Sequence, residues 1–128
     1  MQPAFIDHIV IVVKELQRTE QFYSVFLGKP IHQDKESVVY KIGETKLFFV
    51  LPHGEFSRID KDLGSLNHFA FGVRTSEELK RFENTMNDAG IKNSGIQIDK
   101  YGNKEFIWFD DPDNYRVELY CRPFDESR

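Results

Sequence analysis

The feature that most constrains this sequence is an arrangement of strands and a helix that occurs twice. From Phe5 to Leu51 the order of β-type and helical stretches reads βαβββ, and the same order returns from residue 66 to 121. Such a repeat predicts two equivalent modules and a site between them. We therefore expect one α+β domain of two tandem βαβββ modules, at about 5–52 and 66–122, joined by a linker at 53–65.

Each module begins with a strand and a helix. Residues 5–13 form a β-branched run typical of a buried strand, and residues 16–27 place apolar side chains at helical spacing before Gly28. In module 2, residues 66–73 match the strand, and a capping box at Thr75–Glu78 opens a helix that ends at Gly90. The remaining expected strands are 30–32, 37–41 and 45–51 in module 1, and 91–99, 105–109 and 115–121 in module 2.

Two histidines occupy equivalent positions in the repeat. His8 follows Asp7 in the first strand, and His68 follows Asn67 sixty residues later. A single histidine on an apolar strand is usually a hydrogen-bonded core residue. Two of them in corresponding places indicate imidazoles that converge on one site.

A carboxylate provides the third candidate. Glu118 interrupts an apolar strand, and a buried carboxylate requires a partner. One interpretation is a salt bridge with Arg116, which lies on the same strand face. The other is a metal site, because two imidazoles and one carboxylate form a facial triad with open coordination positions. Given the repeat, we favour a metal held by His8, His68 and Glu118.

Several motifs together resemble the vicinal oxygen chelate superfamily, which includes glyoxalase I, extradiol dioxygenases, fosfomycin-resistance enzymes and bleomycin-resistance proteins. The resemblance covers about residues 5–122. Its motifs are the Asp-His-hydrophobic strand, the Phe22-Tyr-Ser-Val-Phe-Leu-Gly28 helix end, Asn67-His-Phe-Ala-Phe-Gly72, and Phe109-Asp-Asp-Pro-Asp113 followed by Arg116-Val-Glu118.

This resemblance implies a curled mixed sheet around a divalent metal, either Fe, Mn, Ni or Zn, that chelates neighbouring oxygens of a small substrate. The metal ligands carry over to His8, His68 and Glu118. The counterpart of Glu118 in module 1 falls near Phe48, which cannot bind a metal, so the sequence departs from the ligand set of glyoxalase I. Trp108 stands where fosfomycin enzymes and extradiol dioxygenases carry a functional tyrosine.

Further site residues follow from strand parity and from the resemblance. His53 lies fifteen residues before His68, close to where the dioxygenases carry an acid/base histidine, although its loop context also suits an exposed histidine with no function. The side chains that share parity with the ligands of their own or the equivalent strand form a candidate substrate-binding wall. These are Val10, Phe48, Val50, Phe106, Trp108 and Tyr120.

Composition and charge exclude some functions. The net charge is −4 and the charges are interspersed, so nucleic acid is not an expected partner. No apolar run approaches the roughly 20 residues that cross a bilayer, and the N-terminus lacks the pattern of a signal peptide. We expect a cytoplasmic protein that does not associate with a membrane.

The function predicted from these features is metal-dependent catalysis on a small substrate with vicinal oxygens, through Lewis-acid stabilisation of an oxyanion. The enzyme would be a lyase or isomerase, or a ring-cleaving dioxygenase if the metal is iron. The alternative is a metal-free protein that sequesters a small molecule, as bleomycin-resistance proteins do. The resemblance also implies a homodimer.

Overall fold

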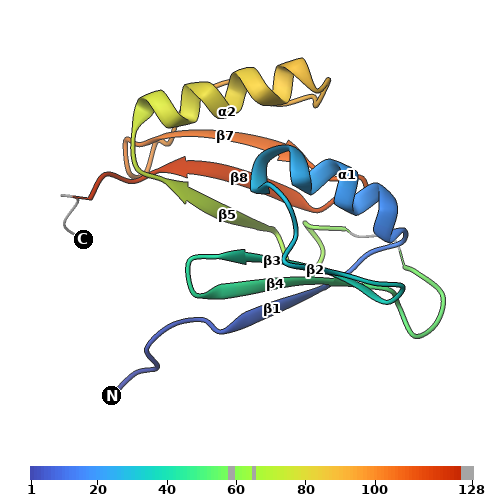
Figure 1. Ribbon diagram of the computed structural model, residues 1–128. Coiled ribbons are helices and arrows are strands. Elements are labelled where there is room, and N and C mark those ends of the chain that lie inside the picture. The colour runs from blue at the N-terminus through green and yellow to red at the C-terminus, as the bar shows by residue number, and fades with distance from the viewer. Residues whose placement is uncertain (58–59, 65, 125–128) are drawn as a thin grey trace. The chain divides into compact units, whose positions relative to one another are not determined.

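The computed structural model describes residues 1–57, 60–64 and 66–124. It divides into two compact units, Met1–Arg58 and Ile59–Arg128. Each unit contains one open four-stranded mixed sheet and one helix, in the order βαβββ (Figure 1). The predicted α+β fold of two tandem modules is therefore confirmed, whereas the single shared domain stays a prediction.

In unit 1 the strands lie in the order β1-β4-β3-β2. The first strand pairs with the last strand of the module in parallel, and the other pairs are antiparallel. The elements are β1 (His8–Val12), α1 (Leu16–Leu27), β2 (His32–Gln33), β3 (Ser37–Ile42) and β4 (Thr45–Val50).

Helix α1 packs against β3 and β4 and buries one face of this sheet. The Tyr23 ring lies 4.3 Å from the Phe49 ring, between centroids, and both side chains are fully buried. The Tyr40 hydroxyl, also buried, hydrogen-bonds the Ser24 hydroxyl at 2.8 Å. Because side chains alternate along a strand, His8 and Val10 lie on the opposite face from buried Ile11.

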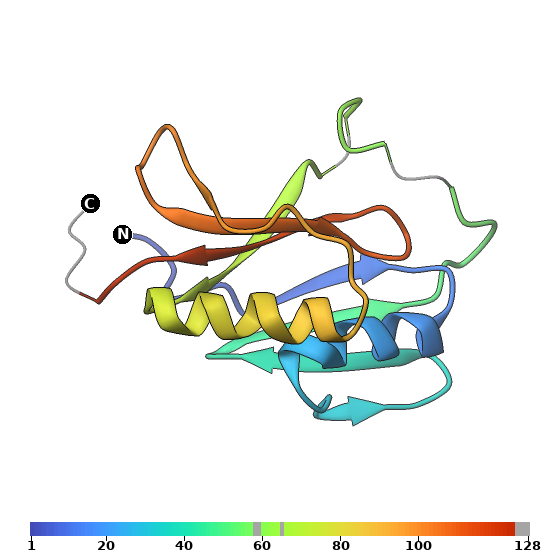
Figure 2. The ribbon, with the colours of Figure 1, turned by 90° about the horizontal axis from the view of Figure 1, so that it is seen from above.

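Unit 2 repeats this arrangement, with the strand order β5-β8-β7-β6 and a parallel β5·β8 pair. Helix α2 lies against β5, β7 and β8 (Figures 1 and 2). The elements are β5 (His68–Val73), α2 (Ser76–Asp88), β6 (Gln97–Ile98), β7 (Glu105–Asp110) and β8 (Arg116–Cys121).

The start of α2 is stabilised as the sequence predicts. The Thr75 hydroxyl accepts a hydrogen bond from the Glu78 backbone, and the Glu78 carboxylate accepts one from the Thr75 backbone. Leu79 and Met86 on this helix are fully buried, together with Ile107 of β7. These residues form part of the core on the helix-covered face of the sheet.

Several predicted strands are shorter than expected. The strand predicted for 5–13 begins at His8, and of the stretch predicted for 91–99 only Gln97–Ile98 is a strand. Before β6, Ser94 contacts β7 at Trp108. The Ser94 amide donates to the Trp108 carbonyl, and the Ser94 hydroxyl accepts a hydrogen bond from the Trp108 amide. Gly95 follows with φ of 69°, which interrupts an extended ladder.

Neither helix of the described residues has the length and apolar composition that a membrane span requires.

Replacement of Thr75 by alanine should lower the free energy of unfolding by about 1 kcal/mol, because an orphan backbone donor loses its acceptor. Thermal or urea unfolding measures the loss. Thr85→Ala, an exposed change inside the same helix, serves as the control and should not destabilise. Equal losses in both variants would contradict the role of the cap.

Burial raises the pKa of Tyr40 to about 12. Because this value exceeds the ordinary value of about 10 in an unfolded chain, the neutral phenol stabilises the fold fully below pH 10. That contribution is lost as the pH rises from 10 towards 12. In Tyr40→Phe, unfolding free energies measured from pH 9 to 11 should therefore fall less steeply than in the unmodified protein. Parallel slopes would contradict this assignment.

Candidate functional site

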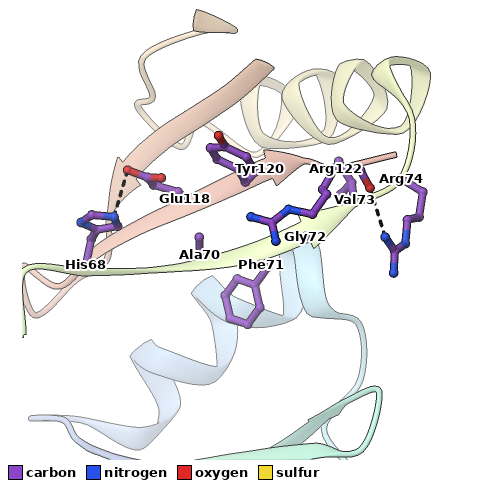
Figure 3. Close-up of a pocket in the computed structure, with 9 residues that line it drawn as sticks. All are labelled: His68, Ala70, Phe71, Gly72, Val73, Arg74, Glu118, Tyr120 and Arg122. Atoms are coloured by element: carbon purple, nitrogen blue, oxygen red, sulfur yellow. Dashed lines mark hydrogen bonds and ion pairs between the residues drawn. The ribbon is translucent and has the colours of Figure 1, made fainter. Parts of the chain in front are cut away.

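The site begins with two side chains on neighbouring strands of unit 2. In the parallel β5·β8 pair, His68 lies opposite Arg116 and Ala70 lies opposite Glu118. His68 and Glu118 are therefore diagonal neighbours on the sheet face that α2 does not cover. The His68 Nε2 atom lies 3.5 Å from Glu118 Oε2 (Figure 3).

The surroundings of Glu118 test one of the two interpretations of this carboxylate, the salt bridge with Arg116. Its side chain is 17% exposed, and among the described residues its ion-pair partner is His68. Arg116, the alternative partner, is engaged elsewhere. Its Nε donates to Asp110 Oδ1 at 2.6 Å and its guanidinium lies 4.0 Å from the Trp108 ring centroid. The salt bridge between Arg116 and Glu118 is therefore absent from the described structure.

The ring orientation of His68 is fixed by its neighbour in sequence. His68 Nδ1 lies 2.7 Å from Asn67 Oδ1, and the Asn67 amide nitrogen donates to the Lys61 carbonyl at 3.2 Å. This second bond places the amide oxygen towards the ring, so Nδ1 must be the donor. In the neutral imidazole, the Nε2 lone pair then faces the Glu118 carboxylate.

Two lone pairs in this arrangement repel each other unless a proton or a cation lies between them. Two ligands at about 2.1 Å from a tetrahedral metal are about 3.4 Å apart. The observed separation of 3.5 Å between His68 and Glu118 is close to that value. The pair therefore has the donor types and the spacing of two metal ligands.

His8 forms a similar hydrogen bond in unit 1. It lies on β1, and its Nδ1 lies 2.8 Å from the Asp7 carboxylate, which leaves Nε2 without a proton in the neutral ring. The β1·β4 register places Val10 opposite Phe48, as Ala70 lies opposite Glu118. Phe48 is thus the counterpart of Glu118, so module 1 contributes a histidine without the carboxylate.

Within the described part of the chain, neither unit brings together three His, Cys, Asp or Glu side chains that could hold a metal. The pair of His68 and Glu118 is established in unit 2. The predicted triad needs His8 from unit 1 as well, and its assembly stays a prediction.

The predicted substrate-binding residues lie on the faces that parity assigns to them. Tyr120 lines the same pocket as His68, and its hydroxyl donates to Asp99 Oδ2 at 2.7 Å. Burial and this bond raise the pKa of Tyr120. Trp108 lies directly opposite Glu118 in the β7·β8 register. The Phe106 ring lies 6.2 Å from the Tyr120 ring.

In unit 1, three of the remaining predicted residues line a second hollow. A pocket of about 600 Å³ is lined by Phe48, Val50 and the exposed His53, among others. Val10 is 54% exposed and lies beside Phe48 in the sheet. The structure thus gives His53 an accessible position next to apolar side chains, and its catalytic role stays a prediction.

The pocket in unit 2 has a volume of about 550 Å³ and contains residues that the sequence interpretation missed. Besides His68, Glu118 and Tyr120, two arginines line it, Arg74 and Arg122. The alternation that groups Glu118 with Tyr120 extends to Arg122 two residues later, so strand parity could have found it.

The orientation of both histidine rings predicts their tautomers. At a pH where the imidazoles are neutral, ¹⁵N spectra should show His8 and His68 with the proton on Nδ1. Asn67→Ala should reduce this preference at His68 alone and leave His8 unchanged. A proton on Nε2 of His68 in the unmodified, metal-free protein would contradict the orientation described above.

Comparison with known proteins agrees with this architecture. The curated uncharacterized protein YwkD from Bacillus subtilis (strain 168) is 27% identical over 124 residues, which cover 90% of this chain and 94% of YwkD. The solved structure of a glyoxalase family protein from Enterococcus faecalis is 26% identical, with a TM-score of 0.72 and coverage of 91% of this chain and 97% of the other.

A lactoylglutathione lyase structure from Agrobacterium tumefaciens has a TM-score of 0.75 at 21% identity, covering 94% of this chain and 96% of that one, and shows a shared fold. The sequence model of the Glyoxalase/Bleomycin resistance protein/Dioxygenase superfamily matches residues 5–119. The chain therefore belongs to the Glyoxalase/Bleomycin resistance protein/Dioxygenase superfamily.

Proposed function

We propose that this protein is a metal-dependent enzyme that acts on a small substrate with two neighbouring oxygens, as a lyase or isomerase, or as a ring-cleaving dioxygenase if the metal is iron. The metal ligands are His8, His68 and Glu118. The observation that carries the proposal is the position of His68 Nε2, 3.5 Å from the half-buried Glu118 carboxylate, in a ring whose Nδ1 bonds Asn67.

The three ligands suit catalysis because of their charge. One carboxylate offsets one of the two positive charges of a divalent ion, and two neutral imidazoles offset none. Three protein ligands also leave coordination positions open for substrate oxygens. When bound, the metal supplies a Lewis acid that stabilises negative charge developing on those oxygens.

The residues next to the ligands hold them in place. Asp7 and Asn67 accept a hydrogen bond from the Nδ1 of the following histidine, which fixes each ring and makes Nε2 the binding atom. The equivalent positions of these bonds in the two modules support His8 as the third ligand, because both rings are held through Nδ1. The adjacent strands β5 and β8 also bring the side chains of His68 and Glu118 close together.

The choice between reaction classes rests on Trp108. Trp108 lies opposite Glu118, at the position where the fosfomycin-resistance enzymes and extradiol dioxygenases that the sequence resembles carry a functional tyrosine. An indole N–H donates a hydrogen bond but neither accepts one nor ionises near neutral pH. We therefore favour lyase or isomerase chemistry whose proton transfer uses a different group, and His53 remains the candidate in unit 1.

The test is the metal content of untagged protein purified without chelator, measured by elemental analysis. We expect about one equivalent of Fe, Mn, Ni or Zn in the unmodified protein and strong loss in His8→Ala, His68→Ala and Glu118→Gln. His32→Ala is the matched control, because His32 also bonds a carboxylate, Asp34, at 2.8 Å. It should keep the metal.

Circular dichroism should show that all these variants stay folded, because the cores of both units lie on the opposite sheet faces. Full metal content in folded His68→Ala or Glu118→Gln would contradict the proposed site. Protein that contains no metal and rejects added metal would instead support a metal-free small-molecule binding protein. Cytoplasmic location and homodimer formation stay predictions, and light scattering measures the latter.

A further inference from the structure

We infer that the pocket of unit 2 binds a substrate with an anionic group, a carboxylate or a phosphate, at the end remote from its neighbouring oxygens, and that Arg122 is the residue that binds this group. The inference rests on the proposed function for the other end of the substrate. It adds a substrate class and a specificity-determining residue to that function.

The pocket has chemically different ends. One end of its lining is formed by His68 and Glu118, and the other by Arg74 and Arg122 (Figure 3). Glu118 and Arg122 are four residues apart along extended chain, a span of about 13 Å between their Cα atoms. The bond from the Arg122 amide to the Val73 carbonyl, at 2.8 Å, continues the β5·β8 pairing to this point.

The floor between the two ends is open. His68, Ala70 and Gly72 share one face of β5 by alternation, and Arg74 follows just after the strand. A methyl group and a hydrogen therefore separate the two functional ends. The phenol of Tyr120, which is tied to Asp99, lines this middle part. The pocket of about 550 Å³ is of the size that small-molecule sites have.

Arg122 is available for a ligand. Its side chain is exposed, and its described interaction is with the face of the Tyr120 ring, at 5.8 Å. Among the described residues, no carboxylate forms a salt bridge with it, in contrast to Arg116, which is paired with Asp110. Figure 3 shows the Arg122 guanidinium directed back over Gly72 into the pocket.

Arg74 acts as a positioning residue. It donates from Nη1 to the Arg122 carbonyl at 3.2 Å, and its guanidinium lies 4.1 Å from the Phe124 ring centroid. These contacts fix the backbone from which the Arg122 side chain extends. The Arg122 guanidinium itself retains the paired donors that suit a carboxylate or a phosphate.

The probe is suberic acid monohydroxamate, which carries two neighbouring oxygens at one end and a carboxylate at the other. Its methyl ester, which carries no charge at the second end, is the control compound. In metal-loaded protein, calorimetry should show that the acid binds about tenfold or more tightly than the ester, because the arginine forms an ion pair with two parallel hydrogen bonds only with the acid. Phosphate-ended and carboxylate-ended probes compared in the same assay distinguish the two anions.

In Arg122→Gln the preference for the acid should disappear while the ester binds as before and metal content is unchanged. Arg81→Gln, which removes the same charge from the exposed surface of α2, is the control and should keep the preference. Gly72→Val should weaken both probes, because its added carbons enter the floor of the pocket, where a Cβ meets nothing closer than 4.0 Å.

Equal affinity of acid and ester for the unmodified protein would overturn the inference, as would a preference that persists in Arg122→Gln. The elemental analysis measures separately whether the protein holds the proposed metal. If the protein holds no metal, ¹⁵N spectra titrated with suberate monomethyl ester and with its dimethyl ester still test Arg122. The monoacid alone should shift the Arg122 Nε–H and Gly72 amide signals, and the absence of such shifts would overturn the inference.

Discussion

The alternation of side chains along β5 and β8 is the constraint on which both the core and the candidate site of unit 2 depend. It directs Leu119 and Val117 into the core under α2. It also directs Glu118 to the opposite face, where the parallel register brings it to His68. A shift of one residue in this register would move the carboxylate into the core and expose the apolar residues.

The two modules use one framework for different chemical contributions. Each has a histidine at the start of its first strand, held through Nδ1 by the preceding side chain. Only module 2 adds a carboxylate, because Phe48 occupies the matching position in module 1. The repeat therefore places an imidazole at the equivalent position of each module. A single divergent position gives module 2 a carboxylate and gives module 1 a more apolar sheet face.

The sequence predicted the order of elements, both helices and the face on which each ligand candidate lies, because these depend on local periodicity and on caps such as Thr75–Glu78. It did not predict the short β6, because Ser94 and Gly95 are held by individual bonds that no pattern reveals. The pairing of Arg116 with Asp110 required coordinates, since Asp110 and Glu118 are both close to Arg116 in sequence. Arg122 was overlooked because it follows the last apolar run.

The proposed function depends most on a metal that joins His68 to Glu118. Crystals of the metal-loaded protein, measured at the absorption edge of the bound element, test it directly through the position of the anomalous peak. We predict one strong peak about 2.0–2.2 Å from His68 Nε2 and from a carboxylate oxygen of Glu118, with His8 Nε2 as a further ligand. A peak on His32 and Asp34 instead, or no ordered metal at His68, would contradict the account.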